Sequence, residues 1–175
     1  MNRRQVLTTA ILACGAAACG PIGRAQSDSA TASKNFPPVN ISRDEWRNIL
    51  DEDRFRILFR AGTEPAFSSP LDKQYDPGTY ICAACFLPLF ESADKFDSRT
   101  GWPSFTKPIA GHVETKADYL LIIPRTEYHC ARCGGHQGHV FDDGPAPTGK
   151  RYCNNGLALL FVAENEVLPD LRRAS

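Results

Sequence analysis

The sequence predicts a mainly β domain whose helices lie at its N-terminal end. The chain has 175 residues, which is enough for one domain with a hydrophobic core and short for two. Its 13 glycines and 13 prolines are scattered between short β-rich runs, a composition typical of turn-rich β proteins rather than helical bundles. The clearest helical pattern lies in one stretch, at residues 42–62.

The charge balance argues against a nucleic-acid or membrane-surface partner. The 20 basic residues cancel the 20 acidic ones, so no net field attracts a polyanion. We therefore expect no nucleic acid among the partners of this chain.

The first 25 residues have the features of a secretory signal. Arg3-Arg4 precede an apolar, small-residue stretch at 6–19, and Gly23-Arg24-Ala25 has a small-x-Ala pattern. The stretch is shorter than the ~20 residues that span a bilayer as a helix. The twin arginine resembles a Tat signal, which exports folded proteins, and an ordinary Sec signal is the alternative. We expect export to the periplasm, with a lipid anchor at Cys19 as a further possibility.

Residues 26–39 are polar and small and predict a flexible linker. We expect residues 40–168 to form the domain and residues 169–175 to form a C-terminal tail.

Ser42 and Glu45 have capping-box spacing, so a helix should begin there. Apolar residues at helical spacing predict its core face, and Gly62 predicts its end. These core residues are Trp46, Ile49, Leu50, Phe55, Leu58 and Phe59.

Short runs rich in β-branched and aromatic residues predict the strands. They are Thr79–Cys82, Pro88–Phe90, His112–Thr115, Leu120–Pro124, His139–Phe141 and Leu157–Val162. The run around Cys153 is also expected to be extended.

Two C-x-x-C pairs, Cys82/Cys85 and Cys130/Cys133, predict a metal site. Two residues between thiols let one tight turn direct both sulfurs at an ion, and two such turns supply the tetrahedral Cys₄ set that zinc prefers. Four thiolates close the coordination shell, so the zinc should be structural. Two local disulfides or a redox pair are the alternatives in an exported chain. Phe86 stands where a glycine would ease the first turn.

Cys153 is the one cysteine of the expected domain outside these pairs. A buried, inert thiol is the simplest interpretation. In an extended strand, however, Arg151, Cys153 and Asn155 project from one face, and a nearby cation increases the thiolate fraction of a cysteine. The pattern therefore favours a nucleophile.

Two further clusters add chemistry. His136 and His139 lie in a glycine-rich stretch just after the second cysteine pair, where an imidazole could serve Cys153 as a proton donor. Trp102 lies between Gly101 and Pro103, so a large aromatic side chain is held in a loop, where it either packs or binds a ligand.

The segments YICAACFLPLF, KFDSRTGWPSF, CGGHQGHVFDDGP and GKRYCNNGLALLF together resemble the B-type methionine sulfoxide reductase family. The resemblance implies reduction of methionine (R)-S-oxide, free or in oxidised proteins, on a β-tent (Mss4-like) fold of two antiparallel sheets with a Cys₄ zinc. It implies that Cys153 is the nucleophile, that Trp102 contacts the substrate methyl group, and that three residues line the pocket. These three are His136, His139 and Asn155; we add Phe141 and Arg151 as substrate-binding residues.

The resemblance also implies a sulfenic acid on Cys153, which a second thiol must reduce. Part of the family has a resolving cysteine where this chain has Thr100. An external reductant, either a thioredoxin-like protein or a small thiol, should therefore recycle Cys153, unless Cys14 or Cys19 does so. The chain also departs from the family pattern at Asn154 and Gly156. We expect a monomer, and a non-catalytic zinc-ribbon binding or chaperone module is the alternative function.

Overall fold

The computed structural model describes residues 36–119 and 124–174. The expected signal, Cys14, Cys19 and most of the expected linker lie outside these residues. In chain order, the described elements are α1 (Arg43–Ile49), α2 (Glu52–Arg60), η1 (Pro70–Lys73), β1 (Gly78–Cys82), β2 (Pro88–Glu91), η2 (Ser92–Asp94), β3 (Lys95–Phe96), β4 (Ser104–Phe105), β5 (Val113–Asp118), β6 (Arg125–Cys130), β7 (His136–Phe141), β8 (Arg151–Asn154), η3 (Gly156–Ala158) and β9 (Leu159–Ala163).

The capping box at the start of α1 is confirmed. The Ser42 hydroxyl accepts a hydrogen bond from the Glu45 backbone, and the Glu45 carboxylate accepts one from the Ser42 backbone. The helical stretch is two helices rather than one, because Asp51 caps a second helix through the backbone N–H of Arg54. This second helix ends at Ala61, which itself takes the left-handed conformation with φ of 50°, so Gly62 lies one residue past the stop.

The break between the helices changes which side chains face the core. Trp46, Phe55 and Leu58 are buried, but Ile49 is 37% exposed, so its assignment to the core was wrong. Ile49 is the last residue of α1 and is followed by the extended Leu50, so it lies at the exposed end of the helix although it is only three residues from Trp46.

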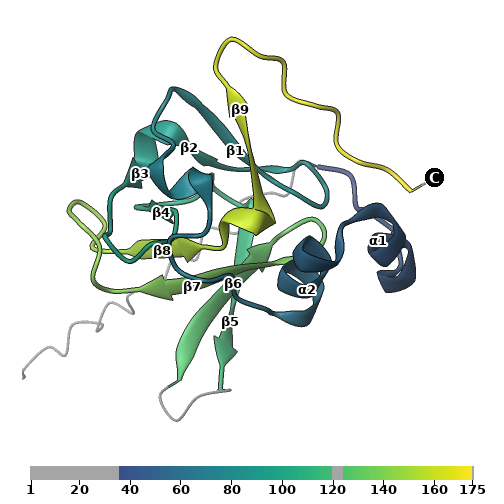
Figure 1. Ribbon diagram of the computed structural model, residues 1–175, viewed down its shortest axis with the longest axis horizontal. Coiled ribbons are helices and arrows are strands. Elements are labelled where there is room, and N and C mark those ends of the chain that lie inside the picture. Colours follow the sequence, from purple (N-terminus) through teal and green to yellow (C-terminus); the bar gives the residue numbers. More distant parts are fainter. Residues whose placement is uncertain (1–35, 120–123, 175) are drawn as a thin grey trace, which may run out of the picture. The chain divides into compact units, whose positions relative to one another are not determined.

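The strands form two antiparallel sheets, as the resemblance implied (Figure 1). One has the order β2-β1-β9, and the other has the order β3-β4-β8-β7-β6-β5. Three predicted strands, Thr79–Cys82, Pro88–Phe90 and His139–Phe141, lie inside observed ones. The predicted strand His112–Thr115 begins one residue before β5, and the prediction of a strand at Leu157–Val162 was wrong for Leu157 and Ala158, which lie in the short helix η3 before β9. Of Leu120–Pro124, the first four residues lie outside the described part of the chain, and Pro124 is irregular and precedes β6.

An aromatic core joins the two sheets. The Phe90 ring of β2 stacks on the Phe105 ring of β4 with a centroid distance of 4.2 Å. Tyr80 of β1 meets Phe105 edge-on at 4.9 Å, and Tyr128 of β6 lies 6.1 Å from Phe90. All four side chains are fully buried. Such ring pairs contribute about 0.5–1.5 kcal/mol each beyond the area that they bury.

The ends of the described chain also contact this core. Phe36 and Val39 pack against it, so ordered contacts begin slightly before the predicted domain start. Leu171 packs against it too, and the backbone N–H of Arg172 donates to the Cys85 carbonyl.

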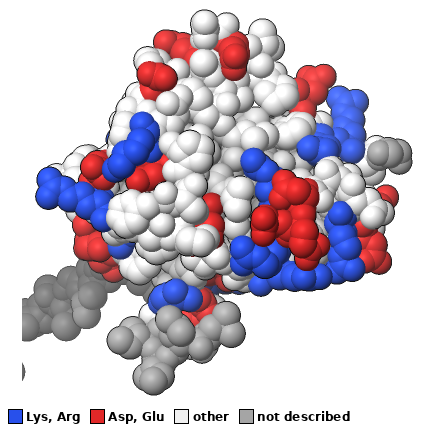
Figure 2. Space-filling view, viewed as in Figure 1, with Lys and Arg blue, Asp and Glu red and all other residues white. Residues whose placement is uncertain are grey.

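The visible face of the molecule mixes both signs of charge (Figure 2). Blue and red side chains alternate on it without a large area of one sign, in line with the balanced composition. Within residues 36–119 and 124–174, no helix is long and apolar enough to cross a bilayer.

Candidate functional site: a four-cysteine cluster and a pocket around Cys153

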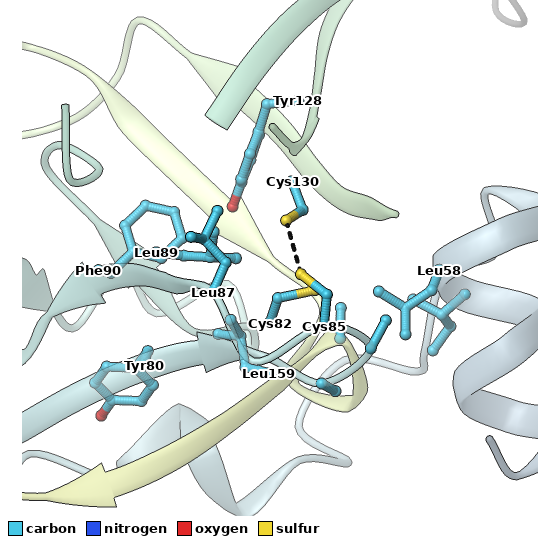
Figure 3. Packing of buried hydrophobic residues seen from close by; sticks show 14 of the residues in the cluster. Leu58, Tyr80, Cys82, Cys85, Leu87, Leu89, Phe90, Tyr128, Cys130 and Leu159 are labelled. Atoms are coloured by element: carbon cyan, nitrogen blue, oxygen red, sulfur yellow. Dashed lines mark hydrogen bonds between the residues drawn. The ribbon is translucent and has the colours of Figure 1, made fainter. Parts of the chain in front are cut away.

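The four paired cysteines lie together, as their spacing predicted. Their sulfurs are all within 4.8 Å of one another, and three of the four side chains are buried. Figure 3 shows Cys82, Cys85 and Cys130 among apolar side chains that include Leu58, Leu87 and Leu159. Cys82 ends β1 in the three-stranded sheet, whereas Cys130 ends β6 in the six-stranded sheet.

The two cysteine pairs have matching turns. The N–H of Phe86 donates to the Cys82 carbonyl, and the N–H of Gly134 donates to the Cys130 carbonyl, each at 2.9 Å. Both donors have positive φ, 64° for Phe86 and 72° for Gly134. The first pair thus adopts the turn that a glycine would favour, even though it holds a phenylalanine. The Arg172 guanidinium covers the Phe86 ring at 4.4 Å.

The cluster has the donor set of a closed tetrahedral metal site. The nearest sulfurs lie 3.5 Å apart between Cys85 and Cys130 and 3.6 Å apart between Cys82 and Cys133. These separations exceed the ~2.05 Å of a disulfide and suit thiolates around one ion. All four of these cysteines are free thiols in the structure, so the alternative of local disulfides within each pair is not what the structure has.

Cys153 lies on β8, an inner strand of the six-stranded sheet. It pairs with Ser104 of β4 on one side and with His139 of β7 on the other. Beside it is a small cavity of about 120 Å³. The cavity is lined by Thr63, Trp102, Arg125, Gly138, His139, Phe141, Cys153, Asn154 and Asn155. A Cβ atom on Gly138 would meet the Cys153 carbonyl oxygen at 1.9 Å, so only glycine lets β7 approach β8 this closely.

The surroundings of Cys153 do not make its thiol easier to ionise overall, contrary to the expectation from Arg151. Burial raises the pKa of the Cys153 thiol and outweighs the charge of Arg151 and the hydrogen bonds of Thr100 and Arg151, which lower it. The expected influence of Arg151 is thus present, but the resting thiol is harder to ionise than a free cysteine. Arg151 and Thr100 are the two neighbours that favour its thiolate form.

Arg151 does not line the Cys153 cavity. It lies behind Cys153, where its guanidinium pairs with the Asp143 carboxylate through two hydrogen bonds of 2.8 and 2.9 Å. The same guanidinium stacks over the Phe141 ring at 4.2 Å. Asp143 therefore fixes the position of the Arg151 guanidinium. Phe141 contributes to the cavity wall and supports Arg151.

The two histidines occupy different places. His139 lines the cavity, and its Nε2 lies 2.8 Å from Asp118 Oδ2. Arg125 donates to the same oxygen at 2.7 Å, so Asp118 is shared between His139 and Arg125. The Arg125 Nε is buried and has no hydrogen-bond partner among the described residues.

His136 is buried and does not line the cavity. Its Nδ1 lies 3.0 Å from Glu127 Oε1, and its ring packs edge-on against His139 with centroids 5.5 Å apart. Burial lowers the pKa of His136 against the opposing effect of Glu127. The structure thus places His136 behind His139, where it supports that ring instead of facing a ligand.

Trp102 and Asn155 are held by one residue that the sequence did not single out. The backbone N–H of Glu64 donates to Asn155 Oδ1 at 3.1 Å, and its carbonyl accepts from the Trp102 indole at 3.2 Å. The Glu64 carboxylate, which is 2% exposed, accepts from the backbone N–H groups of Gly156 and Leu157 at 2.5 and 2.9 Å. Glu64 thereby fixes two walls of the cavity relative to η3.

Both departures from the family pattern are matched by neighbours. Asn154 is fully buried and satisfied: Tyr128 donates to its Oδ1 at 2.6 Å, and its amide donates to the Gln137 side chain at 3.3 Å. At Gly156, a Cβ would lie 1.9 Å from the Ser69 hydroxyl oxygen. The Ser69 side chain therefore occupies the space that a side chain at position 156 would need.

The structure thus brings Cys153, His139, Asn155, Trp102 and Phe141 around one cavity and leaves His136 and Arg151 just outside it. The functional roles of these residues stay predictions. Four lining residues were not anticipated: Thr63, Arg125, Gly138 and Asn154. Only Asn154, adjacent to Cys153, carried a signal in the sequence.

Known proteins are similar to this chain in sequence. Residues 50–163 match the SelR domain family. The chain is 49% identical over 127 residues to the peptide methionine sulfoxide reductase MsrB of Leptospira interrogans, which covers 72% of this chain and 97% of the relative. It is 40% identical over 160 residues to the chloroplastic peptide methionine sulfoxide reductase B1 of Arabidopsis thaliana, covering 91% and 77%. With the MsrB protein of Methanosarcina barkeri it shares 47% over 129 residues, covering 73% and 91%. The matched family, the four-sulfur cluster and the Cys153 cavity agree, and the chain belongs to the SelR domain family of B-type methionine sulfoxide reductases.

Proposed function

We propose that this chain is a peptide-methionine (R)-S-oxide reductase, an oxidoreductase that repairs oxidised proteins. The observation that carries the proposal is the position of Cys153. Of the described cysteines it is the one outside the four-sulfur cluster, and it lines a cavity with His139 and Trp102. The family match and the names of the relatives support the same activity.

The first half-reaction transfers oxygen from the substrate to Cys153. The thiolate attacks the sulfoxide sulfur and forms a sulfur–sulfur bond while the oxygen takes up a proton. Transfer of the oxygen to Cys153 then breaks both this bond and the sulfur–oxygen bond of the substrate, so methionine leaves and Cys153 carries a sulfenic acid. The sulfoxide gains two electrons and leaves as methionine, while the Cys153 sulfur loses two. Trp102 provides an aromatic wall suited to the apolar S-methyl group.

We assign proton delivery to the substrate oxygen to His139. This residue pairs with Cys153 across β7 and β8 and lines the same cavity. Asp118 holds one ring nitrogen at 2.8 Å, which orients the imidazole. His136 packs against the ring from behind and keeps it in place.

The four-cysteine cluster is proposed to hold one structural Zn²⁺. Cys82, Cys85, Cys130 and Cys133 would supply four thiolates, which leaves no open position for a water. Zinc bound there adds folding free energy because it joins elements of both sheets.

The second half-reaction needs an external thiol. Among the described residues the other four cysteines belong to the cluster, and Thr100 stands where a resolving cysteine would be. We propose that a small thiol or a thioredoxin-like protein reduces the sulfenic acid on Cys153 directly, and that the enzyme acts as a monomer.

The N-terminal segment supports export. We propose a twin-arginine signal over residues 1–25 and a periplasmic location, since the Cys₄ site could then take up its metal in the reducing cell interior before export. Mass spectrometry of the exported protein tests this by giving the first residue and any lipid on Cys19.

The activity is tested with separated R and S epimers of a methionine sulfoxide peptide and dithiothreitol as reductant. We expect turnover of the R epimer alone and its complete loss in Cys153→Ser. A Cys153→Ser protein that still reduces the sulfoxide would refute the mechanism. Failure of the wild-type protein on both epimers, with its metal intact, would favour a non-catalytic zinc-binding module.

A further inference from the structure

Gln137 is a buried amide to which the proposed reaction assigns no role. It lies on β7, between β8, which carries Cys153, and β6, which ends at Cys130 (Figure 1). Its side chain is fully buried, and it does not line the Cys153 cavity. An amide buried without hydrogen bonds costs about 1–3 kcal/mol, so the partners of Gln137 show what holds it there.

The Gln137 side chain connects the cysteine cluster to the wall of the cavity. Its Nε2 donates to the Cys82 sulfur at 3.6 Å and lies 3.5 Å from the Gly135 carbonyl oxygen. Its Oε1 accepts from Asn154 Nδ2 at 3.3 Å. Cys82 belongs to the four-sulfur cluster, whereas Asn154 follows Cys153 in β8 and lines the cavity. One side chain thus spans the distance from a candidate metal ligand to the pocket.

The neighbours of this chain of contacts fix its direction. Asn154 Nδ2 donates to the Asn155 carbonyl at 2.8 Å, and the Tyr128 hydroxyl donates to Asn154 Oδ1 at 2.6 Å. A carbonyl can only accept, so the Asn154 nitrogen faces Asn155, and the same nitrogen donates to the Gln137 oxygen. The Gln137 nitrogen is therefore the end that faces Cys82. The Gly135 carbonyl beside it, which also can only accept, requires the same orientation.

An N–H group in this position suits an ionised sulfur. It donates a stronger hydrogen bond to a charged acceptor than to a neutral one. Four thiolates carry more negative charge than one divalent ion cancels, and three of the four cysteines in the cluster are buried. Donors next to the ligands of a metal site orient those ligands and tune their affinity for the metal. Gln137 therefore has the geometry of a donor to a metal-bound thiolate.

We propose that Gln137 is a positioning residue that couples the metal cluster to the pocket wall. It stabilises the Cys82 thiolate, and Asn154 acts on the metal only by fixing the orientation of the Gln137 amide. The inference rests on the proposed zinc site. The coupling is reciprocal, so metal binding also holds the Asn154 side chain through Gln137. The Gln137 backbone adds to this link, because its carbonyl accepts from the backbone and the side-chain amide of Asn155 at 2.8 and 3.0 Å.

The first test measures zinc affinity by competition with a chromophoric chelator, on the full chain. Gln137→Leu removes the donor to Cys82 and should weaken zinc binding ~10–100-fold. Tyr128→Phe is the matched control, because it removes an equally buried hydrogen bond of Asn154 that does not reach a sulfur; zinc affinity should change less than about twofold. Gln137→Met repeats the measurement with an unbranched side chain that lacks the donor. Zinc affinity equal to that of the wild type in both Gln137 variants would overturn the proposal.

The second test asks whether Asn154 acts through Gln137. Asn154→Leu is made together with Tyr128→Phe, so that no buried hydroxyl loses its acceptor, and should weaken zinc binding about threefold. Adding Gln137→Leu should then give the affinity of Gln137→Leu alone, whereas additive losses would exclude the coupling.

Cobalt provides a spectroscopic measurement of the same contact. In the Co²⁺-loaded protein, loss of the hydrogen bond to Cys82 should shift the thiolate-to-metal charge-transfer band of Gln137→Leu to longer wavelength, and Tyr128→Phe should leave the band unchanged. An unshifted band in Gln137→Leu would show that the amide does not donate to a metal-bound sulfur. A wild-type protein that binds neither zinc nor cobalt would instead refute the zinc site itself, and this inference with it.

Discussion

Glu64 offers a quantitative test of how the cavity walls are held. Its carboxylate is buried and accepts two backbone hydrogen bonds, from Gly156 and Leu157, while its own backbone holds Asn155 and Trp102. The change Glu64→Gln keeps the shape of the side chain but replaces one acceptor oxygen with an amide that cannot accept. One backbone N–H then loses its partner, and the other hydrogen bond becomes a neutral one.

The size of the effect follows from these two losses. A hydrogen bond to a charged group contributes ~1.5–3 kcal/mol, and a buried N–H without a partner costs ~1–3 kcal/mol. Relief from burying the carboxylate charge offsets part of this. We expect Glu64→Gln to lower the free energy of unfolding by about 1.5–3 kcal/mol. Displacement of Trp102 and Asn155 by about 1 Å would reduce kcat/KM by up to about 100-fold.

Urea denaturation with zinc present measures the first quantity, and initial rates on the R-sulfoxide peptide measure the second. Glu52→Gln is the matched control, because the Glu52 carboxylate is 67% exposed and pairs with Arg60 on the surface. Such a pair contributes ~0–1 kcal/mol. If Glu64→Gln destabilises the protein no more than the control and leaves kcat/KM unchanged, the anchoring role of Glu64 is wrong.

Three further predictions concern the thiol, the metal cluster and η3. Burial raises the pKa of Cys153, so sulfenic acid formation should speed up as pH rises above neutrality, and Arg151→Met should move the midpoint higher; a stopped-flow pH profile with an unchanged midpoint would contradict this. Cys85→Ser should remove the bound zinc and the cooperative unfolding transition, as judged by metal analysis and circular dichroism, whereas a fully folded, metal-free variant would refute a structural role. Gly156→Ser should destabilise the fold by ~1–3 kcal/mol through its contact with Ser69, and the double variant with Ser69→Gly should recover most of the loss, so additive effects would exclude the clash.

The residues with strong local signals could be predicted from the sequence. The capping box of Ser42 and Glu45 depends on contacts three residues apart, and the two C-x-x-C pairs carry their own turn geometry. The sheet order could not be derived in this way, because β8 pairs with β4 and β7 through residues far apart in the chain. Those pairings determine what surrounds Cys153.

Local sequence patterns did not predict how deeply individual side chains are buried. Strand alternation placed Arg151 beside Cys153 correctly, but the thiol is also desolvated, and that effect on its pKa is the larger one. In the same way, the family resemblance implied that both His136 and His139 line the pocket, whereas β7 directs only His139 to the cavity. Glu64 holds Asn155 and Trp102 through its backbone N–H and carbonyl, and such contacts leave no recognisable motif in the sequence.

The cysteine cluster fastens the end of β1 to the end of β6, and so ties one sheet to the other. Cys153 stands away from that seam, on a strand flanked by backbone hydrogen bonds on both sides. Removal of a metal bound by the cluster should therefore weaken the contact between the two sheets first, while β8 keeps its hydrogen bonds to β4 and β7. An oxidant that reaches the cluster should therefore weaken the link between the two sheets, whereas one that reaches Cys153 should modify a single side chain and leave that link in place.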